Sequence, residues 1–138
     1  MQAKINCAEL GVLDGPLLLF GGPYSNLQAV AALADFAAAH GIGGDQMICT
    51  GDIVAYCGAP SESVAAIRAL GCAVVAGNCE LQLASGAEDC GCGFAPGSSC
   101  DMLSGAWYAH AASQLDAEAN TWMGALPDVA VFQHQGQR

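Results

Sequence analysis

Three short apolar runs alternate with two helical patterns, and this order constrains the fold more than any other feature of the chain. The runs span residues 17–20, 46–50 and 72–76, and each continues into a glycine. Apolar residues recur at helical spacing over 27–37 and over 60–70 between them. Continuous apolar strands indicate a sheet that is covered on both faces. The pattern predicts an α/β protein with β-α-β-α-β order, in which right-handed helical crossovers join parallel strands.

Residues at the helix boundaries support this interpretation. Ser25 or Asn26 can cap the first helix, which we expect to end at Gly41. Pro60 is typical of a first helical turn, and Gly71 is expected to end that second helix.

The rest of the chain departs from this rhythm. We expect one domain over 1–138, with a core at 15–84, a Cys- and Gly-rich insertion at 85–104, and a helix and last strand within 105–138. The helix is predicted from about residue 102 to 123 and carries aromatic residues that we assign to the core or to an interface. The strand at 129–133 is expected to stand alone before a turn, without a returning partner.

Composition excludes several classes of protein. The chain has 138 residues, is 54% hydrophobic and has 3 basic and 13 acidic residues, for a net charge of -10. High apolar content excludes intrinsic disorder. The charge excludes a protein that binds nucleic acid by neutralising its phosphates. It also excludes a protein that binds membrane surfaces through a cluster of basic residues. We expect no signal peptide and no membrane span, and therefore a cytoplasmic protein with reduced thiols.

Two polar residues follow glycines at the predicted carboxyl ends of neighbouring strands. Asp52 follows the second strand and Asn78 the third. Ligands of open parallel sheets bind at this edge, and carboxylate and amide oxygens suit a hard divalent metal ion. The alternative is that both residues bond to their own turn backbone.

These residues lie in motifs that resemble a known family. Gly-Asp-Ile-Val-Ala-Tyr at 51–56, Pro60, and Gly-Asn-Cys-Glu at 77–80 are similar to motifs of the calcineurin-like metallophosphoesterases, most of all the small bacterial phosphodiesterase branch. That family carries D-x-H-G-N-L, G-D-x-V-x-Y-G and G-N-H-D/E in this order. The resemblance implies a metallophosphoesterase-like α/β sandwich, present here as a truncated N-terminal portion. It also implies two metal ions that activate a hydroxide for attack on a phosphoester.

The resemblance carries over unevenly to individual residues. Asp52 matches the metal-bridging aspartate and Asn78 the asparagine ligand of the second metal. In the first motif, however, the aspartate position holds Gly22 and the histidine position Tyr24. The general-acid histidine is replaced by Cys79, so no catalytic residue can be assigned. The later histidine motifs of the family are absent from the chain.

Five of the eight cysteines lie near this edge of the predicted sheet. A thiolate can replace imidazole as a ligand for zinc or iron, so a sulfur-rich metal or redox site is one interpretation. Scattered thiols, or a disulfide formed on oxidation, is the other. The five are Cys57, Cys79, Cys90, Cys92 and Cys100. We assign Cys49 and Cys72 to the core.

Three hypotheses for function follow. The first is a metal-dependent phosphoesterase, a hydrolase or phosphatase acting on a small phosphoester, with Mn, Zn or Fe held by Asp52, Asn78 and Cys79. Such an enzyme is incomplete or degenerate in this chain. The second is a non-catalytic or redox protein on the same fold, with a cysteine-held iron or zinc centre. The third is an interaction module that pairs with another copy as a homo-oligomer.

Overall fold

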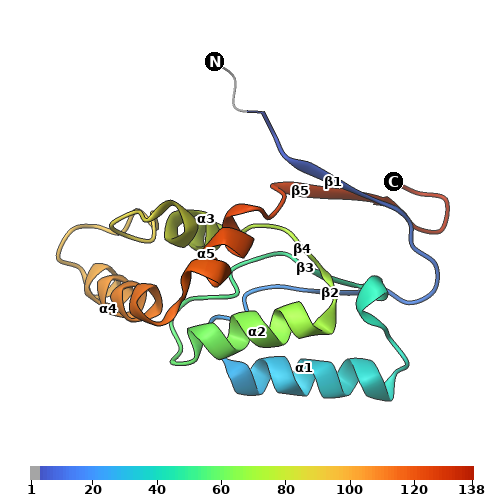
Figure 1. Cartoon of the computed structure of the whole chain (residues 1–138), viewed down its shortest axis with the longest axis horizontal. Helices are drawn as coiled ribbons and strands as arrows, with labels where there is room; N and C mark the ends of the chain where they lie inside the picture. Colours follow the sequence, from blue (N-terminus) through green and yellow to red (C-terminus); the bar gives the residue numbers. More distant parts are fainter. Residues whose placement is uncertain (1–3) are drawn as a thin grey trace.

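The structure is a computed structural model, and it describes residues 4–138. Its centre is a parallel three-stranded sheet with strand order β2-β3-β4. Helices α1 and α2 pack side by side below this sheet in the view of Figure 1. The elements are β2 (Leu18–Phe20), α1 (Leu27–Ala39), β3 (Met47–Cys49), α2 (Pro60–Leu70) and β4 (Ala73–Val74). The predicted β-α-β-α-β order is therefore confirmed.

The helix boundaries follow from the capping residues. The Asn26 side chain accepts a hydrogen bond of 3.0 Å from the Ala29 N–H at the start of α1. Pro60 occupies the first turn of α2, and Gly71 ends it in the left-handed conformation at φ 67°. The chain leaves α1 through Gly41, which has φ 65°.

Strands β3 and β4 are shorter than their apolar runs. The backbone pairing nevertheless continues past them, because Thr50 donates to the Phe20 carbonyl at 2.8 Å and Val75 donates to the Cys49 carbonyl at 2.9 Å. The three strands of the sheet thus stay hydrogen-bonded up to the glycine turns that follow them.

A second sheet pairs strands from opposite ends of the described chain. Strand β5 (Val129–Gln133) was predicted, but the expectation that it stands alone is wrong, because it pairs in parallel with β1 (Cys7–Val12). In Figure 1 this pair lies on the other side of the central sheet from α1 and α2. A glutamate and a glycine interrupt the apolar pattern of β1, and the register shifts between Glu9 and Gly11. These residues conceal the strand from a search for continuous apolar runs.

The single helix predicted at 102–123 is also wrong, since two helices cover that region. Helix α4 (Ser99–Gln114) ends at Leu115, whose backbone is extended. Asp116 then caps α5 (Ala117–Gly124) by accepting the Ala119 N–H at 2.7 Å. An aspartate that caps a new helix outweighs the apolar periodicity that continues through the break. A third helix, α3 (Asn78–Ser85), precedes the Gly- and Cys-rich loop.

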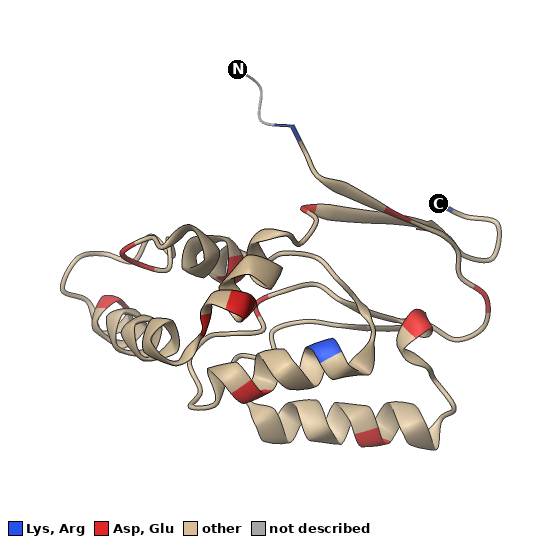
Figure 2. Ribbon diagram, viewed as in Figure 1, with Lys and Arg blue, Asp and Glu red and all other residues tan. Residues whose placement is uncertain are grey.

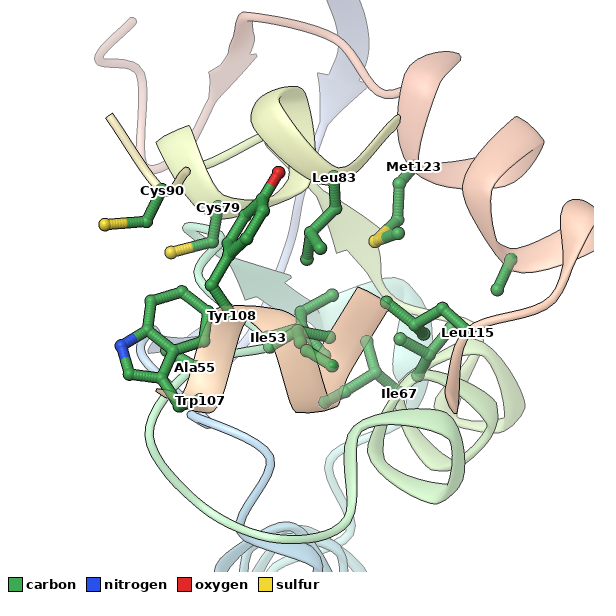
Figure 3. Packing of buried hydrophobic residues seen from close by; sticks show 14 of the residues in the cluster. Ile53, Ala55, Ile67, Cys79, Leu83, Cys90, Trp107, Tyr108, Leu115 and Met123 are labelled. Atoms are coloured by element: carbon green, nitrogen blue, oxygen red, sulfur yellow. The ribbon is translucent and has the colours of Figure 1, made fainter. Parts of the chain in front are cut away.

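One apolar cluster lies between the central sheet and α2, α3, α4 and α5 (Figure 3). Ile53, Ile67 and Met123 are fully buried within it, and Trp107 and Tyr108 contribute from α4. The core therefore extends well beyond residues 15–84. No helix within residues 4–138 has the length and apolar character needed to cross a membrane.

The buried thiol of Cys49 predicts a loss of stability at alkaline pH. Burial raises its pKa from 9.0 to about 12, so the unfolded chain loses this proton at a lower pH than the folded chain. Between these two values the free energy of unfolding falls as pH rises, by up to about 2 kcal/mol at pH 10.5 from this thiol. Urea unfolding at pH 7.5 and pH 10.5 measures the loss, and Cys49→Ala should remove that share of it. An equal alkaline loss in both proteins would contradict the assignment.

Candidate functional site

The turns after β3 and β4 lie in contact at the carboxyl edge of the central sheet. A side chain at Gly51 would collide with the Gly77 backbone, and one at Gly77 would collide with the Asp52 carboxylate. Both positions therefore require glycine. This close approach brings Asp52 beside the first turn of α3, where Asn78 begins the helix.

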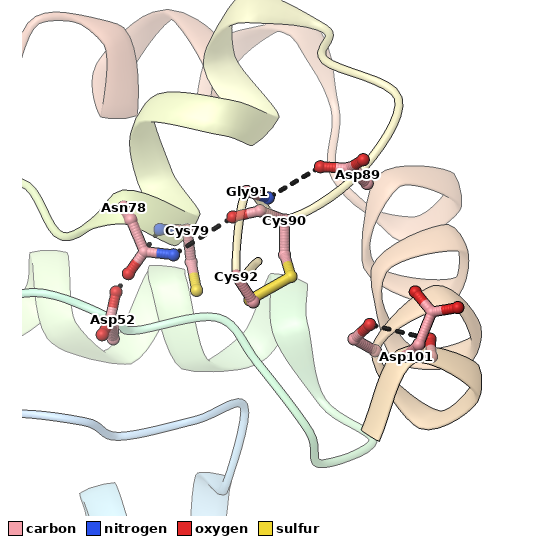
Figure 4. The surroundings of a disulfide bond; sticks show 9 residues. Asp52, Asn78, Cys79, Asp89, Cys90, Gly91, Cys92 and Asp101 are labelled. Atoms are coloured by element: carbon pink, nitrogen blue, oxygen red, sulfur yellow. Dashed lines mark hydrogen bonds between the residues drawn. A yellow bond between two sulfur atoms is a disulfide. The ribbon is translucent and has the colours of Figure 1, made fainter. Parts of the chain in front are cut away.

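The side chains of Asp52 and Asn78 meet at this edge, as the sequence predicted. The Asn78 Nδ2 donates to the Cys90 carbonyl at 3.1 Å, which fixes the orientation of the amide. Its Oδ1 is then directed toward the Asp52 carboxylate (Figure 4). The Cys79 N–H donates to Asp52 Oδ1 at 3.4 Å. Asp52 and Asn78 thus bring a carboxylate and an amide oxygen to one edge of the sheet, and these are ligand types that a hard cation prefers.

The side chain of Glu80 connects the turn after β3 to the turn after β4. Its side chain is fully buried, and its carboxylate accepts the N–H groups of Asp52 and Gly77 at 2.8 Å each. The other oxygen accepts from Ile53 at 2.7 Å and from Val54 at 3.4 Å. Burial raises the pKa of Glu80, while these backbone donors act in the opposite direction by stabilising the carboxylate.

The loop after β2 contributes aromatic surface to the edge. Tyr24 and Ser25 both have left-handed backbone, at φ 53° and 56°. Their N–H groups donate to the carbonyls of Asp52 at 3.1 Å and Ile53 at 2.7 Å. The Tyr24 ring occupies the space that any side chain at Gly22 would need. The two residues that depart from the family motif are therefore neighbours in space, and a side chain at position 22 would require the Tyr24 ring to move.

The cysteines do not assemble into the expected five-residue group. Cys90 and Cys92 are joined in a disulfide, the alternative that we named (Figure 4). Cys79 is buried, which raises its pKa to about 12 and keeps the thiol protonated. Cys57 and Cys100 are exposed. Within residues 4–138, no three His, Cys, Asp or Glu side chains form a group able to hold a metal ion.

No basic side chain belongs to the three loops at this edge. Figure 2 shows basic residues only on α2 and at the two ends of the described chain. Arg68 pairs with Glu118 at 3.0 Å, and Arg138 pairs with Glu9 at 3.0 Å. An anionic group that approaches Asp52 therefore meets negative potential unless a cation is bound there.

Sequence reasoning missed the structural role of Glu80 and the exposure of Tyr56. The role of Glu80 could have been predicted from the sequence. Gly77 is the N-cap of α3, and a glutamate three residues after an N-cap is typical of a capping box. Tyr56 had none, since its exposed side chain depends on the path of the loop between β3 and α2.

Comparisons with known proteins identify the fold. No protein-family model and no curated protein matches the chain. Among solved structures, a metallophosphoesterase from Sphaerobacter thermophilus has a TM-score of 0.55 and 24% identity, covering 82% of this chain and 42% of that one. A putative diadenosine tetraphosphatase has a TM-score of 0.65 and 19% identity, covering 94% and 50%.

These matches confirm the predicted metallophosphoesterase-like α/β fold. The chain spans about half the length of each of the two structures. At these identities the likeness establishes the fold, and the chemistry has to be argued from the residues of this chain.

The residues present fit one hard divalent cation. Mg²⁺ and ions of similar preference are commonly held by one or two protein oxygens together with water and substrate phosphate, and Asp52 and Asn78 supply such oxygens. Gly22 has no side chain, so the aspartate position of the first motif supplies no ligand for a second metal ion in the described chain.

Glu80 makes a testable contribution to stability. In Glu80→Gln an amide N–H₂ replaces one oxygen and faces backbone donors, so two buried N–H groups lose their acceptor. We expect the free energy of unfolding to fall by about 2–5 kcal/mol, measured by urea denaturation. Glu88→Gln, in an exposed position, is the matched control and should change it by less than about 0.5 kcal/mol. Equal effects of the two substitutions would contradict this role.

The cysteine environments predict three classes of thiol. In the folded protein, the exposed Cys7, Cys57 and Cys100 should react rapidly with a thiol reagent, while Cys49 and Cys79 react only on unfolding. Cys90 and Cys92 should react only after reduction. Mass spectrometry of the labelled protein, before and after denaturation and reduction, assigns each site. Rapid labelling of Cys79 in the folded state would contradict its burial.

Proposed function

We propose that the chain is the metal-binding portion of a metal-dependent phosphoesterase, with Asp52 and Asn78 as ligands of one divalent cation. The observation that carries this proposal is the orientation of Asn78. Its nitrogen is held by the Cys90 carbonyl, so its oxygen is directed toward the Asp52 carboxylate. The fold shared with a metallophosphoesterase supports the same conclusion.

The residues at this edge would have two roles, metal ligation and positioning of the ligands. Asp52 and Asn78 would hold the cation, and Glu80 keeps the two turns that carry them at a fixed separation. A bound cation supplies positive charge for the phosphoester and polarises it for hydrolysis. With no basic side chain in these loops, the cation is what would overcome the net charge of -10.

Cys79 is a poor candidate for proton transfer. Its thiol is buried and its pKa is raised to about 12, whereas efficient general acids titrate near the working pH. We therefore assign it no catalytic role. The alternative of a thiolate-held iron or zinc centre loses Cys90 and Cys92 to their disulfide.

Asp52→Asn tests the proposal on the full chain. We expect Mn²⁺ binding, followed by the paramagnetic resonance signal of free Mn²⁺, to weaken by at least about 10-fold, because a neutral amide replaces the carboxylate. Hydrolysis of aryl phosphates and cyclic nucleotides, with Mn, Zn or Fe added, should fall in parallel.

The matched control is Asp35→Asn, an exposed aspartate on α1 that should leave both measurements unchanged. The proposal is wrong if the unmodified chain binds none of these metals. It is also wrong if Asp52→Asn binds Mn²⁺ as tightly as the unmodified chain.

A further inference from the structure

An open apolar cleft lies next to the Asp52 turn and is not used by the proposed metal site. It has a volume of about 520 Å³, within the range of small-molecule sites. The loop between β3 and α2 forms one wall, and helix α4 forms the other. Its lining includes Tyr56, Cys57 and Gly58 from the loop, and Leu103, Trp107 and His110 from the helix.

Aromatic rings connect this cleft to the loop after β2. Tyr56 packs edge-on against Trp107, with ring centroids 5.5 Å apart, and against Tyr24 at 5.0 Å. Although it has two aromatic neighbours, Tyr56 remains 56% exposed. A rigid and exposed ring fixed in this way offers a surface for stacking with a planar ligand at little cost in conformational entropy.

The backbone holds Tyr56 in a conformation that local energetics disfavour. Its φ is 40°, and a bulky residue in the left-handed region costs on the order of 1–2 kcal/mol. The following N–H, that of Cys57, donates to the Tyr24 carbonyl at 3.1 Å. The Tyr24 N–H in turn donates to the Asp52 carbonyl at 3.1 Å. The ring position is thus tied through the backbone to the proposed metal ligand.

A polar side chain in the cleft wall favours a ring that carries hydrogen-bonding groups. His110 is exposed and lines the cleft from helix α4. His110 Nε2 lies 3.2 Å from the Gly58 carbonyl and therefore donates to it, which leaves Nδ1 as an acceptor when the ring is neutral.

We propose that this cleft binds the planar heteroaromatic group of the phosphoester substrate, as in a nucleotide base, while the phosphate reaches Asp52 and Asn78. This inference rests on the proposed function for the position of the phosphate. The ring itself needs no positive charge, since stacking on Tyr56 and hydrogen bonding to His110 Nδ1 operate on a neutral group. A strongly acidic chain can therefore recognise this part of an anionic substrate.

Binding of three phosphate esters in the presence of Mn²⁺ separates the contribution of the ring from that of the phosphate. Adenosine 5′-monophosphate carries sugar and base, ribose 5-phosphate lacks the base, and phenyl phosphate has a ring without heteroatoms. Calorimetry on the full chain should show the nucleotide binding roughly 10- to 100-fold more tightly than ribose 5-phosphate, the range expected for one stacked base. Phenyl phosphate should fall between them, because it can stack but offers no ring donor to His110 Nδ1.

Variants at Tyr56 identify the surface responsible. Tyr56→Gly keeps the left-handed backbone accessible and should reduce the preference for the nucleotide to near one, while Tyr56→Phe should retain it. Phe36→Ala removes an exposed aromatic from α1 and is the matched control, expected to have no effect. Circular dichroism checks that each variant is folded.

The outcomes distinguish failure of this inference from failure of the proposed function. Equal affinity for the nucleotide and ribose 5-phosphate, absence of binding by both, or a preference unchanged in Tyr56→Gly would overturn the aromatic site. Tighter binding of phenyl phosphate than of the nucleotide would overturn the heteroaromatic assignment. If the preference for the base persists but removal of Mn²⁺ changes no affinity and no turnover occurs, the ring site stands and the proposed function fails.

Discussion

The buried carboxylate of Glu80 is the interaction on which the geometry of this edge depends. Four backbone N–H groups from two separate turns converge on it, and both turns would otherwise leave donors buried without partners. The requirement for glycine at positions 51 and 77 has the same origin, because only bare backbones can approach closely enough to share one acceptor. Asp52 and Asn78 meet because Glu80 holds the backbone beneath them.

The loop after β2 gives this edge of the sheet an aromatic character. Where the family motif has an aspartate and a histidine, this chain has Gly22 and an aromatic ring that fills the vacated space. The Tyr24 side chain supplies aromatic contact area at this position. Together with Tyr56 and Trp107, it produces an edge with one hard-oxygen pair beside an aromatic surface, and with no cationic side chain in its loops.

Most of the central sheet could be predicted from the sequence, since its strands, caps and glycine turns are local signals. Asp52 and Asn78 were located in the same way, because parallel strands end at one edge. The β1–β5 pairing could not be predicted, since Glu9 and Gly11 break the apolar pattern of β1. Asp116 ended a helix that apolar periodicity alone would continue. The Cys90–Cys92 disulfide and the exposure of Tyr56 depend on loop paths that spacing does not encode.

The pairing of β1 with β5 has a consequence for folding during synthesis. Asn6 donates to the Asp128 carboxylate at 2.7 Å across a sequence separation of 122 residues, and the strands that follow them pair in parallel. Translation proceeds at about 5–20 residues per second, so β1 leaves the ribosome on the order of ten seconds before its partner exists. During that interval its backbone donors and acceptors are open to other strands.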